Sequence, residues 1–292
     1  MPVKVYTMSD LHVDYHGNMQ HLLNLKHPDY ADSTLIVSGD CSDNLDKLSQ
    51  LLCHFKTIFA EVFFVPGNHE LWVRDDKHAH SIDKFESILR LCQNLGVHTQ
   101  PVKIGSGEHS VWIVPMFSWY TKPGEGDDNL FEHKDGNDIT EEIWSDNRFC
   151  RWDPLAPDQS VVDYFLALNT QHVERQYDAP VISFSHFLPL KELSFVIGFL
   201  ENGPKHFIDP LPEFNFTRVA GTSRLAAQIK QAGSVMHIHG HQHRNRHRDI
   251  DGITHISHCL GYPKERQNPH WRGTNLPKQV WHDGKIDVEQ PF

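Results

Sequence analysis

Five short apolar segments, each ending in polar residues that can bind metal, constrain the fold of this chain more than any other feature. The segments span 3–8, 33–37, 61–65, 180–184 and 234–238. Each is bounded by turn residues, which is typical of buried β-strands. Apolar residues also recur at helical spacing over 44–59 and 81–95. This alternation of strand and helix indicates a sheet covered by helices.

The rest of the chain predicts a further strand, two helices and two long irregular segments. The strand is expected over 111–119 and the helices over 161–175 and 223–232. Residues 121–160 and 201–217 are rich in turn residues with weak periodicity, so both are interpreted as loop insertions that shape a pocket. Asp-Gly turns at 251–252 and 283–284 predict closing β-hairpins. We expect one domain over residues 1–292.

The polar residues lie at the predicted carboxyl ends of the five strands. They are Asp10-Leu11-His12, Gly39-Asp40-Cys41-Ser42-Asp43, Gly67-Asn68-His69-Glu70, Ser185-His186 and Gly240-His241-Gln242-His243. Ligands of open α/β sheets bind outside the carboxyl ends of the strands, so residues far apart in sequence can converge there.

The residue types in these segments suit a pair of metal ions. Asp-x-His and His-x-His place two side chains on the same side of an extended segment, and Asp40 has a second oxygen with which to bridge two cations. Mixed imidazole, carboxylate and amide ligands suit Mn, Fe, Zn, Ni or Co. One such motif in a chain with 23 histidines is more often a turn with surface histidines. Five in order at predicted strand ends favour a metal site.

The order of the motifs resembles the calcineurin-like metallophosphoesterase family, whose pattern runs DxH, GDxxD, GNH[DE], an isolated His and GHxH. The resemblance extends from Asp10 to His243, nearly the whole chain. It implies an α/β fold in which two mixed sheets form a four-layer α-β-β-α sandwich. It also implies an enzyme that hydrolyses phosphate esters with two divalent transition-metal ions, at a site formed by strand ends.

The same resemblance implies a role for each residue. The first metal would be bound by Asp10, His12 and His243. The second would be bound by Asn68, His186 and His241, with Asp40 bridging both. His69 resembles the general acid that protonates the leaving-group oxygen, and Asp43 the carboxylate that orients it and favours its imidazolium. A hydroxide that bridges the metals would attack phosphorus in line.

Three functions remain open at this point. The first is hydrolysis of a phosphomonoester or phosphodiester on a small or nucleotide-like substrate. The second is a nuclease on DNA or RNA ends, against which the net charge of −11 weighs. The third is a non-catalytic metal-binding scaffold, although all seven ligands and His69 are present. Protein phosphatases place arginines beside the site, whereas here Arg74 is the first arginine after His69. This position weighs against a phosphoprotein substrate.

Several side chains are open candidates for substrate contact. Beside the last motif these are His258, Tyr262, Lys264, Arg266 and the basic cluster Arg244–Arg248. Elsewhere they are Arg148, Arg151, Trp72, Trp119, Tyr120 and Trp271. Cys41 follows the expected bridging ligand, where we expect a small buried residue rather than a redox-sensitive thiol.

The composition predicts a soluble, cytoplasmic protein. The five cysteines show no CxxC spacing, so a disulfide framework is not expected. There is neither a signal-like start nor an apolar run near 18 residues, so we expect no membrane partner. The expected partner is a small phosphate ester, and the sequence leaves the oligomeric state open.

Overall fold

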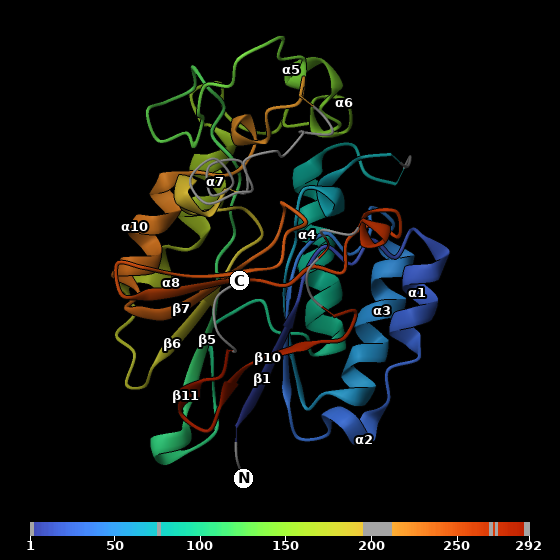
Figure 1. Cartoon of the computed structure of the whole chain (residues 1–292), viewed down its shortest axis with the longest axis vertical. Coiled ribbons are helices and arrows are strands. Elements are labelled where there is room, and N and C mark those ends of the chain that lie inside the picture. Colours follow the sequence, from blue (N-terminus) through green and yellow to red (C-terminus); the bar gives the residue numbers. More distant parts are fainter. Residues whose placement is uncertain (1–2, 75–76, 195–211, 269–270, 272–273, 289–292) are drawn as a thin grey trace.

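The computed structural model describes residues 3–74, 77–194, 212–268, 271 and 274–288. Two sheets lie between two groups of helices (Figure 1). The first sheet has the strand order β11-β10-β1-β2-β3, with β1 Lys4–Met8, β2 Thr34–Ser38, β3 Glu61–Val65, β10 Lys278–His282 and β11 Lys285–Ile286. The second has the order β4-β5-β6-β7-β9-β8, with β4 Val102–Ile104, β5 Val111–Pro115, β6 Val181–Phe184, β7 Ser234–His239, β8 Arg246–Ile250 and β9 Ile253–Ser257.

Both sheets are mixed, as the resemblance implied. Strands β1, β2 and β3 pair in parallel, and β10 is antiparallel to β1. Strands β5, β6, β7 and β9 are parallel, and β4 and β8 are antiparallel at the two edges. The inner faces share one hydrophobic core, in which the rings of Phe63 and Phe184 meet edge to face with centroids 6.5 Å apart.

Helices form the two outer layers and complete the predicted α-β-β-α sandwich. The first sheet is accompanied by α1 His16–Leu23, α2 His27–Tyr30, α3 Leu45–Ile58 and α4 Ser81–Leu95 (Figure 1). The second is accompanied by α7 Val161–Leu168, α8 Thr170–Glu174 and α10 Ser223–Gln231. Helix α3 begins where the Asn44 side chain accepts the backbone N–H groups of Asp46 and Lys47, so the chain leaves the end of β2 and turns directly into a capped helix.

The predicted elements differ from the observed ones where side chains override the pattern. The strand expected over 111–119 ends at Pro115, and the helix expected over 161–175 is interrupted at Asn169. One side chain connects the two places. The Asn169 side chain accepts a hydrogen bond from the Phe117 backbone N–H and donates one to the Phe117 carbonyl, each at 2.8 Å. It thereby ties the end of β5 to the break between α7 and α8.

The segment 121–160 is not wholly irregular. It contains the short helices α5 Thr140–Ile143 and α6 Asp146–Phe149, which Figure 1 places above the strand ends. Of the second predicted insertion, 201–211 lies outside the described residues, and 212–217 is irregular up to a short 3₁₀ turn. The expectation of a single domain stays a prediction.

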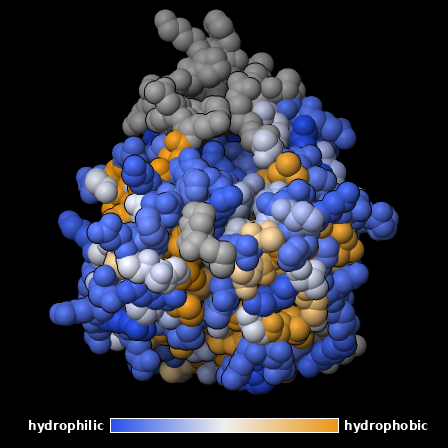
Figure 2. Space-filling view, turned by 90° about the horizontal axis from the view of Figure 1, so that it is seen from below, coloured by the Kyte–Doolittle hydropathy of each residue, from blue (hydrophilic) through white to orange (hydrophobic). Residues whose placement is uncertain are grey.

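The described part of the molecule contains no helix that is both long enough and apolar enough to cross a membrane. Figure 2 shows the face seen from below, where hydrophilic side chains prevail and apolar ones form small separate groups. The cytoplasmic location stays a prediction.

Candidate metal centre

The structure brings the seven predicted ligands together at the carboxyl ends of the strands. One cluster contains Asp10, His12, Asp40 and His243, and a second contains Asp40, His186 and His241. Within each cluster the donor atoms all lie within 4.8 Å of one another. The amide Oδ1 of Asn68 lies 3.2 Å from His186 Nε2, so Asn68 joins the second cluster. Asp40 belongs to both.

The backbone adopts an unusual conformation at these positions. Positive φ angles occur at Asp10 (51°), His12 (42°), Asp40 (55°), His241 (74°) and His243 (47°). Such angles are uncommon for residues other than glycine and concentrate at functional sites. Close approach adds a second constraint, because a Cβ atom at Gly67 would lie 2.2 Å from Asp40 Oδ1.

Hydrogen bonds from outside the clusters fix which histidine nitrogen faces the site. His186 Nδ1 lies 2.8 Å from the Ser38 carbonyl, and His241 Nε2 lies 2.9 Å from the Val219 carbonyl. A carbonyl only accepts, so each of these nitrogens carries the proton and the other is left to bind a cation. His243 Nδ1 is held in the same way by Glu265 at 2.8 Å.

The electrostatics of the clusters also fit metal binding. Burial lowers the pKa of His12 and of His241 well below the ordinary value, which favours neutral imidazoles. Burial acts in the same direction on the other two histidines, but carboxylates outweigh it: Asp40 raises the pKa of His186 to about 9, and Glu265 and Asp10 raise that of His243. Burial raises the pKa of Asp40, but His186 and His69 outweigh it and hold that pKa well below the ordinary value. A buried set of imidazole, carboxylate and amide donors fits divalent transition metals, and their identity stays a prediction.

Glu70 organises the turns that carry these ligands, a role that the sequence analysis missed. Its buried carboxylate accepts four backbone N–H groups: those of Asp40 (2.9 Å), Cys41 (2.5 Å), Ser42 (3.0 Å) and Gly67 (2.7 Å). Burial raises its pKa to about 7. Four donors nevertheless satisfy only the ionised form, and on that geometry we regard Glu70 as charged.

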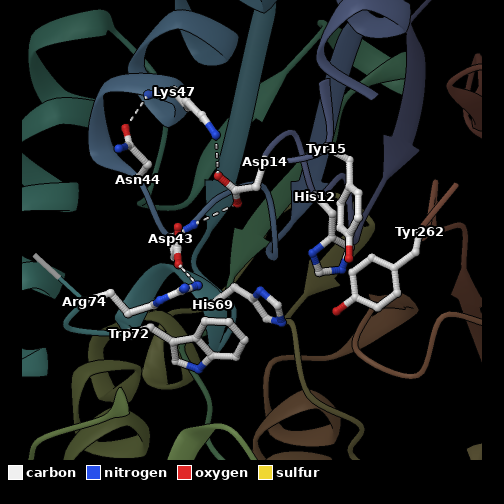
Figure 3. A pocket seen from close by; sticks show the side chains of 10 residues that line it. All are labelled: His12, Asp14, Tyr15, Asp43, Asn44, Lys47, His69, Trp72, Arg74 and Tyr262. Carbon is white, nitrogen blue, oxygen red and sulfur yellow. Dashed lines mark hydrogen bonds and ion pairs between the residues drawn. The ribbon is translucent and has the colours of Figure 1, made fainter. Parts of the chain in front are cut away.

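A cavity of about 610 Å³ opens beside the clusters (Figure 3). Its lining consists of His12, Asp14, Tyr15, Asp43, Asn44, Lys47, His69, Trp72, Arg74 and Tyr262. Both cations of this lining are paired with carboxylates, Lys47 with Asp14 at 3.0 Å and Arg74 with Asp43 at 2.7 Å. The charges of the cavity wall are therefore balanced, and the rings of Tyr15, Trp72 and Tyr262 add aromatic surface to a largely polar lining.

His69 lies where the clusters meet the cavity. Its Nε2 is 3.8 Å from Asp40 Oδ2, and its ring lies over Trp72 with centroids 3.7 Å apart. The carboxylate of Asp43 pairs with Arg74 and acts on His69 through space. Burial lowers the pKa of His69 and outweighs the opposite effects of Asp40 and Asp43. Asp43 therefore acts in the direction that favours the imidazolium, but burial has the larger effect on the pKa of His69. The role expected for Asp43 stays a prediction.

Other predicted contact residues divide into two groups. Tyr262 and Trp72 do line the cavity, and the Tyr262 ring lies 4.4 Å from that of His12 between centroids. Arg74 also lines the cavity. An arginine therefore does lie beside the site, although the position of Arg74 in the sequence had weighed against a phosphoprotein substrate. His258 does not: it is buried and its Nε2 lies 2.8 Å from the Leu276 carbonyl.

The remaining candidates do not line the cavity. Arg266 donates to the carbonyls of Leu260 and Gly261 and to the Asn18 side chain. Trp119 and Tyr120 are buried in the core, while the exposed Arg148, Arg151 and Lys264 are not among the residues that line the cavity. Trp271 lies against Gly261. Cys41 is buried as expected, and burial raises the pKa of its thiol well above the ordinary value.

The basic cluster Arg244–Arg248 is engaged with a neighbouring backbone segment. Arg246 donates to the carbonyls of Leu193 and Ser194, and Arg248 donates to that of Glu192. These bonds hold the backbone of residues 192–194. They give the cluster a structural role.

Comparisons with known proteins agree with this geometry. A family model described as calcineurin-like phosphoesterase matches residues 3–190. An acyl-carrier-protein phosphodiesterase of Mycobacterium tuberculosis, PptH, is 26% identical over 97% of this chain and 86% of its own length. An uncharacterised protein of Acanthamoeba polyphaga mimivirus is 25% identical over 89% of this chain and 92% of its own. The crystal structure of PptH superposes with a TM-score of 0.73 at 24% identity and covers 95% of both chains.

Proposed function

Because the chain belongs to the calcineurin-like phosphoesterase family and is a phosphate-ester hydrolase, we propose that it hydrolyses a phosphodiester with two divalent transition-metal ions. The observation that carries this proposal is the position of Asp40 in both ligand clusters. One carboxylate shared by two clusters is the arrangement that holds two cations close together. When bound, such a pair lowers the pKa of a water between them and neutralises charge on the phosphoryl oxygens.

The protein's own residues would position the ester and supply the proton. The ligand histidines are held in one tautomer by Ser38, Val219 and Glu265, so the donor atoms need no rearrangement on binding. His69, at the border of clusters and cavity, would protonate the leaving oxygen. A phosphoryl group bound beside His69 brings negative charge, which favours the protonated ring that burial disfavours. Asp43 adds to this effect through space.

The cavity supports a diester with an uncharged leaving group. A group that leaves past His69 enters a space of about 610 Å³, far larger than a phosphate needs. Because Lys47 and Arg74 are already paired with carboxylates, a further anionic group would have to displace one of them. The aromatic rings of Tyr15, Trp72 and Tyr262 instead suit an uncharged organic group. The relative PptH is named as an acyl-carrier-protein phosphodiesterase, and that name supports a diester substrate here.

The test combines metal content with hydrolysis. Chelated protein is reloaded with Mn, Ni, Co, Fe, Zn or Mg and assayed on p-nitrophenyl phosphate, bis-p-nitrophenyl phosphate and phosphopantetheinylated acyl carrier protein. We expect two ions per chain, metal-restored turnover, and a higher kcat/KM for the diesters than for the monoester. Faster hydrolysis of the monoester would overturn the diester assignment. Absence of stoichiometric metal would overturn the whole proposal.

A further inference from the structure

Asp146, on α6 of the 121–160 segment, lies directly behind the second ligand cluster. Its side chain is 2% exposed, and both carboxylate oxygens accept hydrogen bonds. Oδ1 accepts from Asn68 Nδ2 at 2.8 Å and from Trp72 Nε1 at 2.6 Å. Oδ2 accepts from Trp144 Nε1 at 2.9 Å. A buried carboxylate with three donors is well satisfied and has a fixed orientation.

The first of these bonds determines which end of the Asn68 amide faces the clusters. An amide has an oxygen and a nitrogen of similar shape, and only the oxygen can bind a cation. A carboxylate only accepts, so the nitrogen must point to Asp146. The oxygen is then turned to the opposite side, where it lies 3.2 Å from His186 Nε2. Among the residues that the structure describes, Asp146 is the hydrogen-bond acceptor of the Asn68 side-chain nitrogen, so it selects this orientation.

The second bond fixes the wall behind His69. The Trp72 indole donates to the same Asp146 oxygen and lies over the His69 ring at an interplanar angle of 31°. The third bond ties in Trp144, whose ring lies edge to face against the ligand His241 with centroids 5.9 Å apart. Asp146 thus contacts the predicted ligand Asn68 directly. It also holds the two tryptophans that lie against the predicted ligand His241 and the predicted acid His69.

We propose that Asp146 is a positioning residue for the second metal: Asp146 orients the Asn68 amide oxygen toward that metal. This inference rests on the proposed function, since it assumes that Asn68 is a ligand. It also gives the 121–160 segment a second role: besides bordering the pocket, it forms part of the support of the metal centre.

The test is the substitution Asp146→Ala, with metal content and affinity as readouts. An alanine removes the acceptor that holds the Asn68 side-chain nitrogen, so the Asn68 amide is no longer held in one orientation. In titrations of chelated protein with Mn²⁺ or Zn²⁺, we expect the second ion to bind about 10- to 100-fold more weakly and the first to bind as before. We expect kcat to fall in proportion to second-site occupancy and to recover at high metal concentration.

The matched control is Asp138→Ala. Asp138 belongs to the same segment and accepts a hydrogen bond from Arg218 at 2.6 Å, but it is not among the hydrogen-bond partners of the predicted ligands. It should leave both metal affinities unchanged. Asp146→Leu, which fills the space of the carboxylate without offering an acceptor, provides a second variant if Asp146→Ala does not fold.

A double-mutant cycle shows whether Asp146 acts through Asn68. If it does, Asp146→Ala should weaken second-site binding no further when Asn68→Ala is already present. Fully additive effects would overturn the inference, as would unchanged affinities in Asp146→Ala. In either case the wild-type protein would still bind two ions, whereas failure of the proposed function would appear as a wild-type protein without stoichiometric metal.

Discussion

Among single residues, Asp40 has the most constrained position. It is buried, has a φ of 55°, contributes to both clusters and accepts the His69 backbone N–H at 3.0 Å through Oδ1. Its own backbone N–H is held by Glu70. A side chain with so many simultaneous roles leaves little freedom for replacement, which makes its substitution informative.

We expect Asp40→Ala to lose both metal ions, because each cluster loses a ligand and the two cations lose the anion between them. Metal analysis after dialysis should fall from two ions per chain toward none. Asp32→Ala is the matched control, since Asp32 has a similar φ of 63° but is exposed and lies outside the clusters. Two ions retained by Asp40→Ala would refute the bridge.

His69→Ala should separate proton transfer from metal binding. Removal of a general acid costs about 10²- to 10⁴-fold in turnover, so we expect a loss of this size on alkyl esters. The loss should be small on p-nitrophenyl esters, because p-nitrophenolate leaves without a proton. Metal content should not change, and His133→Ala, at an exposed position, should be neutral. Equal losses on both ester types would contradict the acid assignment.

The sequence predicted which residues would converge as candidate ligands, but not which residues would hydrogen-bond to them and hold them in place. Asp10, Asp40 and Asn68 each follow a parallel strand of the first sheet, so their convergence follows from strand order. Glu265 and Asp146 lie in segments without periodicity, and their contacts depend on how loops pack onto the sheets. No short-range pattern encodes that packing.

At the scale of elements, the turns after β2 and β3 form one unit through Glu70. Its Oε1 accepts two N–H groups from the first turn, and its Oε2 accepts one from each turn. A glutamine would have to direct its NH₂ group at two N–H donors whichever way the amide is turned. The unit therefore depends on an acceptor-only side chain.

For this reason we expect Glu70→Gln to lower the free energy of unfolding by about 3 kcal/mol or more. Urea denaturation of the chelated protein measures this without any contribution from bound metal. The control Glu86→Gln, on the exposed face of α4, should change stability by no more than about 0.5 kcal/mol. A neutral effect of Glu70→Gln would show that the turns are held by other contacts.

Among the helices, prediction succeeded for α3 and α4 and failed for those of four residues. Helices α3 and α4 extend over three or more turns with an apolar face, and such periodicity is visible in sequence. Helices α2, α5 and α6 have four residues each, which is too short for a periodic pattern. They form because of tertiary contacts such as those of Asp146.

At the scale of the whole molecule, strand pairing was the least predictable feature. The Asp251-Gly252 turn correctly predicted the hairpin of β8 and β9. It gave no sign that β9 would insert beside β7 in parallel and leave β8 at the edge. In that position four of the five β9 residues are buried, and such burial is a property of the assembled fold.

The same insertion buries histidines that have no place in the metal clusters. His255 on β9 is 2% exposed and His258 just beyond it is 3% exposed. Burial lowers the pKa of each to about 4. Both are therefore neutral in the folded protein near pH 5, whereas in the unfolded chain, with an ordinary pKa of 6.5, they are protonated.

Stability should consequently fall with acid in a defined range. A depressed folded pKa means that the stabilisation is complete above pH 6.5 and is lost as the pH falls toward 4, because the unfolded chain binds the additional protons. Each of the two histidines adds up to about 1.4 kcal/mol per pH unit to the slope of the unfolding free energy against pH. Over the whole range, each adds up to about 3 kcal/mol. Urea unfolding at pH 7, 6 and 5 in the presence of chelator, so that metal release does not contribute, measures this slope.

The variant His255→Phe tests the assignment. It should reduce the slope by up to the contribution of one proton, while stability at pH 7 stays closer to that of the wild type. The control His133→Ala, at an exposed position, should not alter the slope. An unchanged slope in His255→Phe would mean that His255 can be protonated within the folded sheet.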